Sequence, residues 1–219
     1  MPNWTQNDLV ITGTKEAIDG VYGLLGDKFD FNKIIPMPKE LQDDTHGTNC
    51  PMCGKKFERI AMNSQSENQT VKIHIYESKC SDCDISDNIG GRLGSTMFDS
   101  KNDIYKQLSF NEKIIAQKWE QKYGTASWYD WSNKNWNTKW NVTDDANIDR
   151  KNNTEIRVYF QTAWDAPYPV LEELSKMFDV KIMHRYEHED GNEQGVMCYE
   201  NGHTEAQDLR LSEVARIWC

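Results

Sequence analysis

The stretch Thr154-Glu-Ile-Arg-Val-Tyr-Phe-Gln-Thr-Ala-Trp164 decides the fold of this chain. Its apolar and polar side chains alternate, and a period of two is typical of a β-strand with one buried face. Residues 167–178 follow with apolar side chains at helical spacing, whereas residues 180–187 and 195–200 return to strand-like patterns. The C-terminal half therefore predicts a strand, a helix and two further strands.

The chain before this stretch supplies the other predicted elements. Residues 8–13 predict a short strand, and residues 14–28 predict a helix in which Thr14 caps the first turn. Helical spacing recurs over residues 103–123, and the last segment, residues 209–219, fits either a strand or a short helix. We expect an α+β fold, with a ferredoxin-like antiparallel sheet and helices on one of its faces.

Composition places the chain among acidic globular proteins. Of its 219 residues, 37% are hydrophobic and 27% are charged, and 8 Trp, 9 Tyr and 7 Phe supply an aromatic core. No apolar run reaches the length of a membrane span, and no basic-then-apolar start resembles a signal peptide. The formal net charge of −10 argues against a protein that binds nucleic-acid phosphates over its whole surface. These features exclude the collagen, coiled-coil, transmembrane and disulfide-rich secreted classes, and predict a soluble cytoplasmic protein that binds no membrane.

Four of the six cysteines form two Cys-x-x-Cys pairs, Cys50-Pro-Met-Cys53 and Cys80-Ser-Asp-Cys83. Each such turn points two thiolates toward one centre. Two turns together complete the tetrahedral sulfur set that Zn²⁺ prefers in closed structural sites. The spacing therefore predicts one structural zinc ion, bound by Cys50, Cys53, Cys80 and Cys83.

The layout of the two pairs is that of a zinc ribbon. We expect the ribbon over residues 45–92, inserted into an α+β domain that is formed by residues 1–44 and 93–219. A redox pair or disulfides are the alternatives for these cysteines. His46 or His74 could also replace one of the ligands.

Four tryptophans fall within the stretch Trp128-Tyr-Asp-Trp-Ser-Asn-Lys-Asn-Trp-Asn-Thr-Lys-Trp140. Their spacing does not keep one helical face, so we expect an irregular loop. In one interpretation the rings fill the core of the domain, since tryptophan is mostly buried. In the other they form an exposed surface that binds a protein partner, bases or sugars. The residues of this second interpretation are Trp128, Asp130, Trp131, Asn135, Trp136, Lys139 and Trp140.

Four stretches of the sequence together are similar to a known family. They are Met1-Pro-Asn-Trp4, Phe31-Asn-Lys-Ile-Ile-Pro-Met-Pro-Lys-Glu-Leu41, the tryptophan-rich residues 123–140 and Thr162-Ala-Trp-Asp-Ala-Pro-Tyr-Pro169. In this combination the chain resembles the YubB-type (Api-like) ferredoxin-like-fold protein family of phages and conjugative plasmids. It departs from the family pattern at Thr5, where members carry Cys, and at Asn137, where members favour Gly. The resemblance implies the fold and a mobile genetic element in a bacterial host cell, and it implies no catalytic residue.

The function that we expect is non-enzymatic, because the sequence contains no phosphate-binding glycine loop, nucleophile elbow or two-histidine metal motif. We expect an accessory protein of a phage or plasmid that binds a host protein. Its most concrete form is an inhibitor of a host defence system, anti-CRISPR or anti-restriction, whose acidic surface occupies a basic nucleic-acid channel. An enzyme would instead need a cleft around Asp130, Asn135 and Lys139.

A nucleic-acid-binding module is the alternative function. Zinc ribbons and ferredoxin-like sheets both serve this role, with exposed aromatic rings that stack on bases. The predicted ribbon is also more basic than the rest of the chain. The residues that would bind nucleic acid are Lys55, Lys56, Arg59, Lys72 and Lys79.

Overall fold

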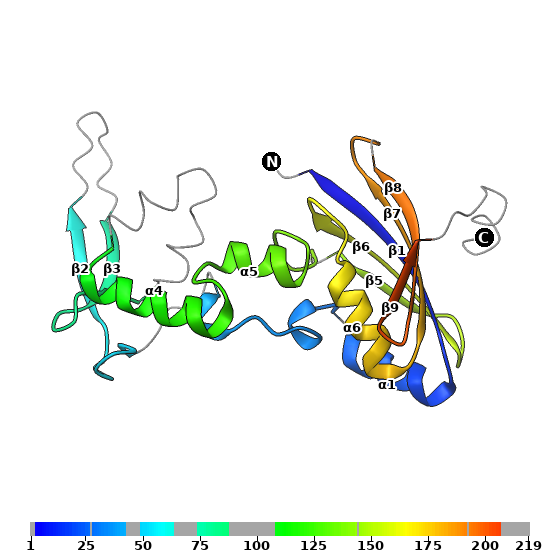
Figure 1. The fold of residues 1–219 in the computed structure, drawn as a ribbon, viewed down its shortest axis with the longest axis horizontal. Coiled ribbons are helices and arrows are strands. Elements are labelled where there is room, and N and C mark those ends of the chain that lie inside the picture. The colour runs from blue at the N-terminus through cyan, green and yellow to red at the C-terminus, as the bar shows by residue number, and fades with distance from the viewer. Residues whose placement is uncertain are drawn as a thin grey trace. The chain divides into compact units, whose positions relative to one another are not determined.

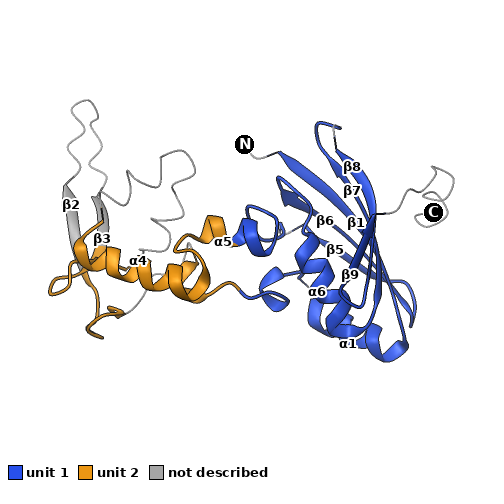
Figure 2. Cartoon of the chain, in the orientation of Figure 1, with its two compact units in different colours: residues 1–36, 132–219 blue, residues 37–131 orange. Residues whose placement is uncertain are grey.

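The structure is a computed structural model that describes residues 3–26, 28–42, 49–63, 74–87, 108–143, 145–191 and 193–206, with the backbone alone for residues 59–63 and 74–77. Figure 1 shows the elements along the chain. The chain forms two compact units, which we name unit 1 (residues 1–36 and 132–219) and unit 2 (residues 37–131) (Figure 2). Within the described ranges, no helix has the length and apolar character needed to cross a membrane.

Unit 1 is built on a six-stranded sheet in the order β5-β6-β1-β7-β8-β9, in which every neighbouring pair is antiparallel (Figure 1). Its strands are β1 (Trp4–Thr12), β5 (Asn147–Arg150), β6 (Glu155–Ala163), β7 (Lys181–His188), β8 (Gln194–Glu200) and β9 (His203–Ala206). The three strands predicted in the C-terminal half correspond to β6, β7 and β8. The first strand begins at Trp4 rather than Asp8, because it pairs along its whole length with β6.

One face of this sheet and two helices form the core of unit 1. Helices α1 (Lys15–Leu25) and α6 (Tyr168–Phe178) pack on that face, as Figure 1 shows. Alternate residues of the strands and one stripe of each helix are buried. These residues include Leu9, Ile11, Ile156, Val158, Phe160 and Ile182 of the sheet, and Ile18, Val21, Leu25, Val170, Leu171 and Leu174 of the helices. The expected α+β arrangement, an antiparallel sheet with helices on one face, is confirmed.

The predicted first helix is correct at its start and too long at its end. Thr14 is the N-cap, because its side chain accepts the backbone N–H of Ala17 at 3.2 Å. The helix ends at Leu25 rather than near residue 28. Gly26 takes a φ of 58° there and donates its N–H to the carbonyl of Tyr22, and this conformation terminates the helix.

Two edge strands of unit 1 are not among the predicted elements. Strand β5 pairs with β6 from Asn147 to Arg150, although Ile148 is the one apolar residue among its four. Strand β9 is exposed along its whole length and pairs with β8. Edge strands are often polar on both faces, so the hydrophobic pattern does not reveal them. The predicted element at residues 209–219 lies outside the described residues.

Unit 2 combines a small sheet with helices. Strands β2 (Glu58–Asn63), β3 (His74–Cys80) and β4 (Ile85–Ser86) pair antiparallel in the order β2-β3-β4. Helix α4 (Phe110–Tyr123) is the described part of the helix predicted from residue 103, and Ser109 is its N-cap. The tryptophan-rich stretch was expected to be irregular, but its first eight residues form helix α5 (Trp128–Asn135), whose residues are divided between the two units.

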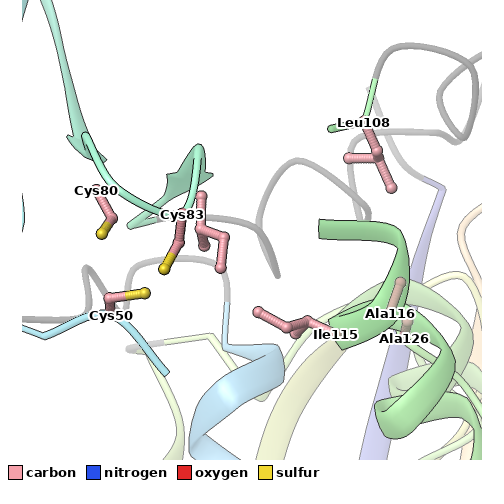
Figure 3. Close-up of a cluster of buried hydrophobic side chains, with 8 residues drawn as sticks. Cys50, Cys80, Cys83, Leu108, Ile115, Ala116 and Ala126 are labelled. Atoms are coloured by element: carbon pink, nitrogen blue, oxygen red, sulfur yellow. The ribbon is translucent and has the colours of Figure 1, made fainter. Parts of the chain in front are cut away.

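The core of unit 2 joins the cysteine turns to α4 (Figure 3). Its buried members are Cys50, Cys80, Cys83, Ile85, Leu108, Ile115, Ala116 and Ala126, and Phe57 and Trp119 pack against them. Because α4 shares this core with the cysteines, it belongs to the same unit. The unit therefore extends to residue 131, and the predicted ribbon boundaries at residues 45 and 92 fall inside it.

Candidate metal centre and candidate binding surface

The two Cys-x-x-Cys turns have the same backbone geometry. In the first, the N–H of Gly54 donates to the carbonyl of Cys50 at 2.9 Å; in the second, the N–H of Asp84 donates to the carbonyl of Cys80 at 2.8 Å. The closing residue is left-handed in both turns, with φ of 73° at Gly54 and 53° at Asp84. Asp is one of the few residues besides Gly that tolerate this region. The sequence therefore builds two matching turns that each present a pair of thiols.

The four thiol groups lie close together around one centre. The sulfur atoms of Cys50, Cys53, Cys80 and Cys83 all lie within 4.8 Å of one another, and all four residues are free cysteines. The Sγ atoms of Cys53 and Cys80 are 3.6 Å apart. A tetrahedron with metal–sulfur bonds of about 2.3 Å has sulfur–sulfur edges of about 3.8 Å, so this spacing suits a metal ion. These four cysteines could therefore hold one metal ion, and no disulfide joins them.

Backbone N–H groups of both turns lie against the sulfurs. The N–H of Lys55 lowers the pKa of the Cys53 thiol to about 7. At Cys80, burial raises the pKa, and the N–H groups of Cys83 and Asp82 act in the opposite direction. Donors directed at sulfur favour the thiolate, the form that binds metal. The neighbouring Cys53 thiol and burial raise the pKa of Cys83 to about 12.

The start of helix α4 is bonded to the second cysteine turn. The Ser109 hydroxyl donates to the carbonyl of Asp84 at 2.6 Å, and the Asn111 amide donates to the carbonyl of Cys83 at 2.8 Å. The Glu112 carboxylate is 2% exposed and accepts the N–H groups of Ser86 and Ser109, each at 2.9 Å. The turn and the helix therefore form one hydrogen-bonded structure.

Two of the basic residues predicted to bind nucleic acid are paired with acidic residues of the second turn. Lys55 forms an ion pair with Asp82, and the Nζ of Lys79 lies 2.5 Å from a carboxylate oxygen of Asp84. Lys56 is exposed, and its backbone pairs with Asn49. The side chain of Arg59 and the whole of Lys72 lie outside the described residues.

The tryptophan-rich stretch divides into buried and exposed rings. Trp131 is 6% exposed and Trp136 is 3% exposed. The Trp136 indole donates to the carbonyl of Ile35 at 2.9 Å, and its ring meets Phe31 edge-on at 5.8 Å. Neither Trp131 nor Trp136 can anchor a partner in the folded chain. The core interpretation applies to these two residues, because each indole is enclosed and Trp136 has its N–H satisfied inside unit 1.

The other predicted residues of this stretch before Trp140 are half-buried. Trp128 packs edge-on against Tyr129 at 5.9 Å, and its indole nitrogen has no hydrogen-bond partner among the described residues. The backbone N–H of Asp130 bonds to the Ser127 hydroxyl at 3.4 Å, and Asn135 ends helix α5.

A partly exposed cluster of three rings and one lysine lies on unit 1, and only half of it was found from the sequence. The Nζ of Lys139 lies 4.1 Å from the ring centroid of Trp140 and 5.2 Å from that of Trp164. The rings of Trp4 and Trp140 are 6.4 Å apart, and Trp140 is 40% exposed. We name Trp4, Lys139, Trp140 and Trp164 the aromatic patch. The sequence analysis missed Trp4 and Trp164 as site residues, because no local spacing connects them to residues 139 and 140.

A buried polar network occupies the sheet of unit 1 beside α6. The His184 imidazole is fully buried; its Nε2 lies 3.0 Å from Asn7 Oδ1 and its Nδ1 lies 3.2 Å from the Tyr199 hydroxyl. The Asn7 amide nitrogen donates to the carbonyl of Thr5 and to the hydroxyl of Thr162. The Asn7 oxygen must therefore accept from Nε2–H, which leaves Nδ1 as an acceptor for the Tyr199 hydroxyl. Burial lowers the pKa of His184 to about 3, so the ring is neutral at physiological pH.

Part of this chain is similar to a known family. Residues 135–215 match the model of a family described as the ferredoxin-like domain in Api92-like protein. The crystal structure of a protein Api92 from Yersinia pseudotuberculosis is similar to this chain at 13% sequence identity, with a TM-score of 0.45 over 96% of this chain and 99% of that one. No curated protein matches the chain. The C-terminal part of unit 1 is thus similar to the ferredoxin-like domain of Api92-like proteins.

Proposed function

We propose that the chain is a non-enzymatic binding protein whose partner is another protein. The observation that carries this proposal is the aromatic patch on an acidic unit of the chain, in which Trp140 is 40% exposed and Trp4 and Trp164 are half-buried. Exposed tryptophans contribute strongly to protein interfaces because they bury a large area with few rotatable bonds. Unit 2, in this proposal, is a zinc ribbon extended by helix α4.

The metal ion of unit 2 is zinc in this proposal. Four thiolates within 4.8 Å form a closed, four-coordinate sulfur set, which suits a structural zinc ion and leaves no open position for catalysis. We expect one zinc ion per chain by elemental analysis of the purified protein. The Cys50→Ser Cys80→Ser double variant should lose it, whereas Cys198→Ser, which changes a cysteine of β8, should retain it. A native, fully folded protein that contains no metal would contradict the proposal.

The most concrete form of the function is inhibition of a host defence complex by a phage or plasmid protein. A formal net charge of −10 allows the surface to occupy a basic channel that otherwise holds nucleic acid. Such binding weakens as salt screens the charges, so inhibition that is unchanged at high salt would argue against the charge-mimic form.

The proposal is tested by a pull-down of the tagged full chain from a bacterial lysate, with and without nuclease. A stoichiometric protein that remains bound after nuclease treatment is the expected result. Recovery of nucleic acid, with all proteins lost after nuclease, would overturn it.

A nucleic-acid-binding module is the second candidate, and exposed Lys56 on the first cysteine turn favours it. The ion pairs of Lys55 with Asp82 and of Lys79 with Asp84 reduce the positive charge available for phosphate. We expect any mobility shift of single-stranded DNA at low salt to disappear in Lys56→Ala. Absence of a shift with the wild-type protein at low salt would remove this candidate.

A further inference from the structure

The aromatic patch is held in place by hydrogen bonds from neighbouring backbone. The N–H of Trp164 donates to the carbonyl of Asn3 at 2.8 Å, and the N–H of Lys139 donates to the carbonyl of Ala163 at 3.2 Å. Trp164 has a φ of 82°, a conformation that a bulky residue rarely adopts. The Thr5 hydroxyl bonds to its carbonyl at 3.1 Å and helps to hold it there. Backbone strain of this kind tends to occur at binding sites, and a surface already fixed in place loses little freedom when it binds.

The patch already contains a cation. The Lys139 ammonium faces the rings of Trp140 and Trp164, and no carboxylate pairs with it among the described residues. Indole faces attract cations through their quadrupole, and an arginine guanidinium stacks on them especially well. The position of Lys139 therefore marks where the patch can receive a positive group.

Acidic side chains lie around the same end of the sheet. Asp165 directly follows Trp164, and the N–H of Glu189 donates to the carbonyl of Trp4 at 2.9 Å. Glu189 belongs to the turn between β7 and β8, which also carries exposed Asp190 and Glu193. Acidic residues also outnumber basic ones over unit 1 as a whole. This field attracts cations and repels phosphate.

We propose that the aromatic patch binds a basic segment of the protein partner, with an arginine or lysine side chain stacked on Trp140 and Trp4 beside or in place of Lys139. The inference deepens the proposed function and rests on it, since it names the surface and the chemistry of the partner. Exposed Trp140 and half-buried Trp4 supply the stacking, and the acidic residues around this end of the sheet supply the charge complementarity. The same acidic residues would repel the phosphates of a nucleic acid, because both are negatively charged.

The test uses the full chain, labelled with ¹⁵N, and three probes. They are a hexapeptide of alternating glycine and arginine, the same peptide with uncharged citrulline in place of arginine, and a short oligo-dT. We expect the arginine peptide to shift the indole N–H resonances of Trp4 and Trp140, and the other two probes to leave them in place. Equal shifts with the citrulline peptide, shifts with oligo-dT, or no shift with the arginine peptide at millimolar concentration would each overturn the proposal.

Three variants distinguish binding by the aromatic patch from binding by the overall negative charge of the chain. Trp140→Ala should weaken binding of the arginine peptide by roughly five- to tenfold, a typical effect of a lost cation–π contact. Lys139→Met, which removes the competing cation at similar size, should strengthen it by roughly two- to fivefold. Tyr159→Ala, which removes a 37% exposed ring elsewhere on unit 1, is the matched control and should bind like wild type. Equal affinities for Trp140→Ala and Tyr159→Ala, or weaker binding by Lys139→Met, would overturn the assignment.

Failure of this inference is distinguishable from failure of the proposed function. If Trp140→Ala captures the same nuclease-resistant protein as wild type in the pull-down, the chain binds a protein through another surface, and only the inference fails. If no protein remains after nuclease treatment with either bait, the proposed function itself fails.

Discussion

Removal of the metal ion that we propose for the four cysteines is expected to unfold the cysteine turns and the first turns of helix α4 while unit 1 stays folded. Structural zinc contributes about 10–16 kcal/mol in small zinc domains, more than a small apolar core can replace. Cys50, Cys80 and Cys83 form part of that core with Leu108 and Ile115. The three hydrogen-bonding side chains at the start of α4 also depend on the second turn.

Hydrogen exchange with mass spectrometry measures this outcome by segment. After treatment with a chelator, peptides from residues 108–123 should lose most of their protection, and peptides from β1, β6 and β7 should keep theirs. The Cys198→Ser variant, treated in the same way, is the control for cysteine substitution outside the turns. Full protection of α4 after complete metal removal would show that apolar packing alone holds the helix, contrary to this expectation.

Glu112 tests whether the helix and the second turn are coupled through hydrogen bonds. Glu112→Ala leaves two backbone N–H groups, those of Ser86 and Ser109, without their acceptor, at a cost of about 1–3 kcal/mol each. Glu112→Gln keeps one acceptor oxygen and should cost less. We expect the metal affinity to fall in the same order, measured by competition with a chelator. Equal affinities of both variants and wild type would exclude the coupling.

The second large effect is a loss of unit 1 stability in mild acid. The folded-state pKa of His184, about 3, lies below the ordinary value of 6.5. The unfolded chain therefore binds the proton more tightly, and stability is lost as the pH falls from about 6.5 toward 3. The slope is about 1.4 kcal/mol per pH unit, so about 2 kcal/mol is lost by pH 5.

The surroundings of His184 explain why a protonated, positively charged imidazole is unfavourable at this position. The groups packed around the ring are Asn7 of β1, Tyr168 of α6, Tyr186 of β7 and Tyr199 of β8, and all of them are neutral. Burial also raises the pKa of Tyr168 and of Tyr199, so neither ring becomes an anion that could pair with the imidazolium. Protonation would leave a buried charge without a counter-ion, which is among the most unfavourable states in a protein core.

Denaturant unfolding at pH 7, 6 and 5 measures this slope. His184→Gln should be less stable at pH 7, since it disturbs the network, but its stability should fall less steeply with acid by about 1.4 kcal/mol per pH unit. His203→Gln changes an exposed histidine of β9 and should keep the wild-type slope. Parallel slopes for wild type and His184→Gln would contradict the role of this histidine.

The sequence predicted those elements whose signal is local. The alternation of apolar and polar residues over 154–164 predicted β6, and the helical spacing of apolar residues over 167–178 predicted α6. The grouping of Cys50 and Cys53 with Cys80 and Cys83 was also predictable from the sequence. Each Cys-x-x-Cys turn is a local structure, and two such turns together supply the four thiols of one site. The two edge strands were missed, since each has only four residues and, apart from Ile148 and Ala206, these residues are polar.

The tertiary structure decided which tryptophans are core and which are surface. Trp136 and Trp140 are four residues apart and chemically identical, yet Trp136 is enclosed beside Phe31 and Trp140 is 40% exposed beside Trp4. Local spacing cannot separate them, because burial depends on segments distant in the chain that pack against each ring. The same holds for the aromatic patch, which joins Trp4, Lys139 and Trp164 only after β1 and β6 pair. Sequence by itself therefore predicted the inner strands of the sheet and the four-cysteine cluster, while the pairing of distant strands, driven by burial of their shared face, brought the aromatic patch together.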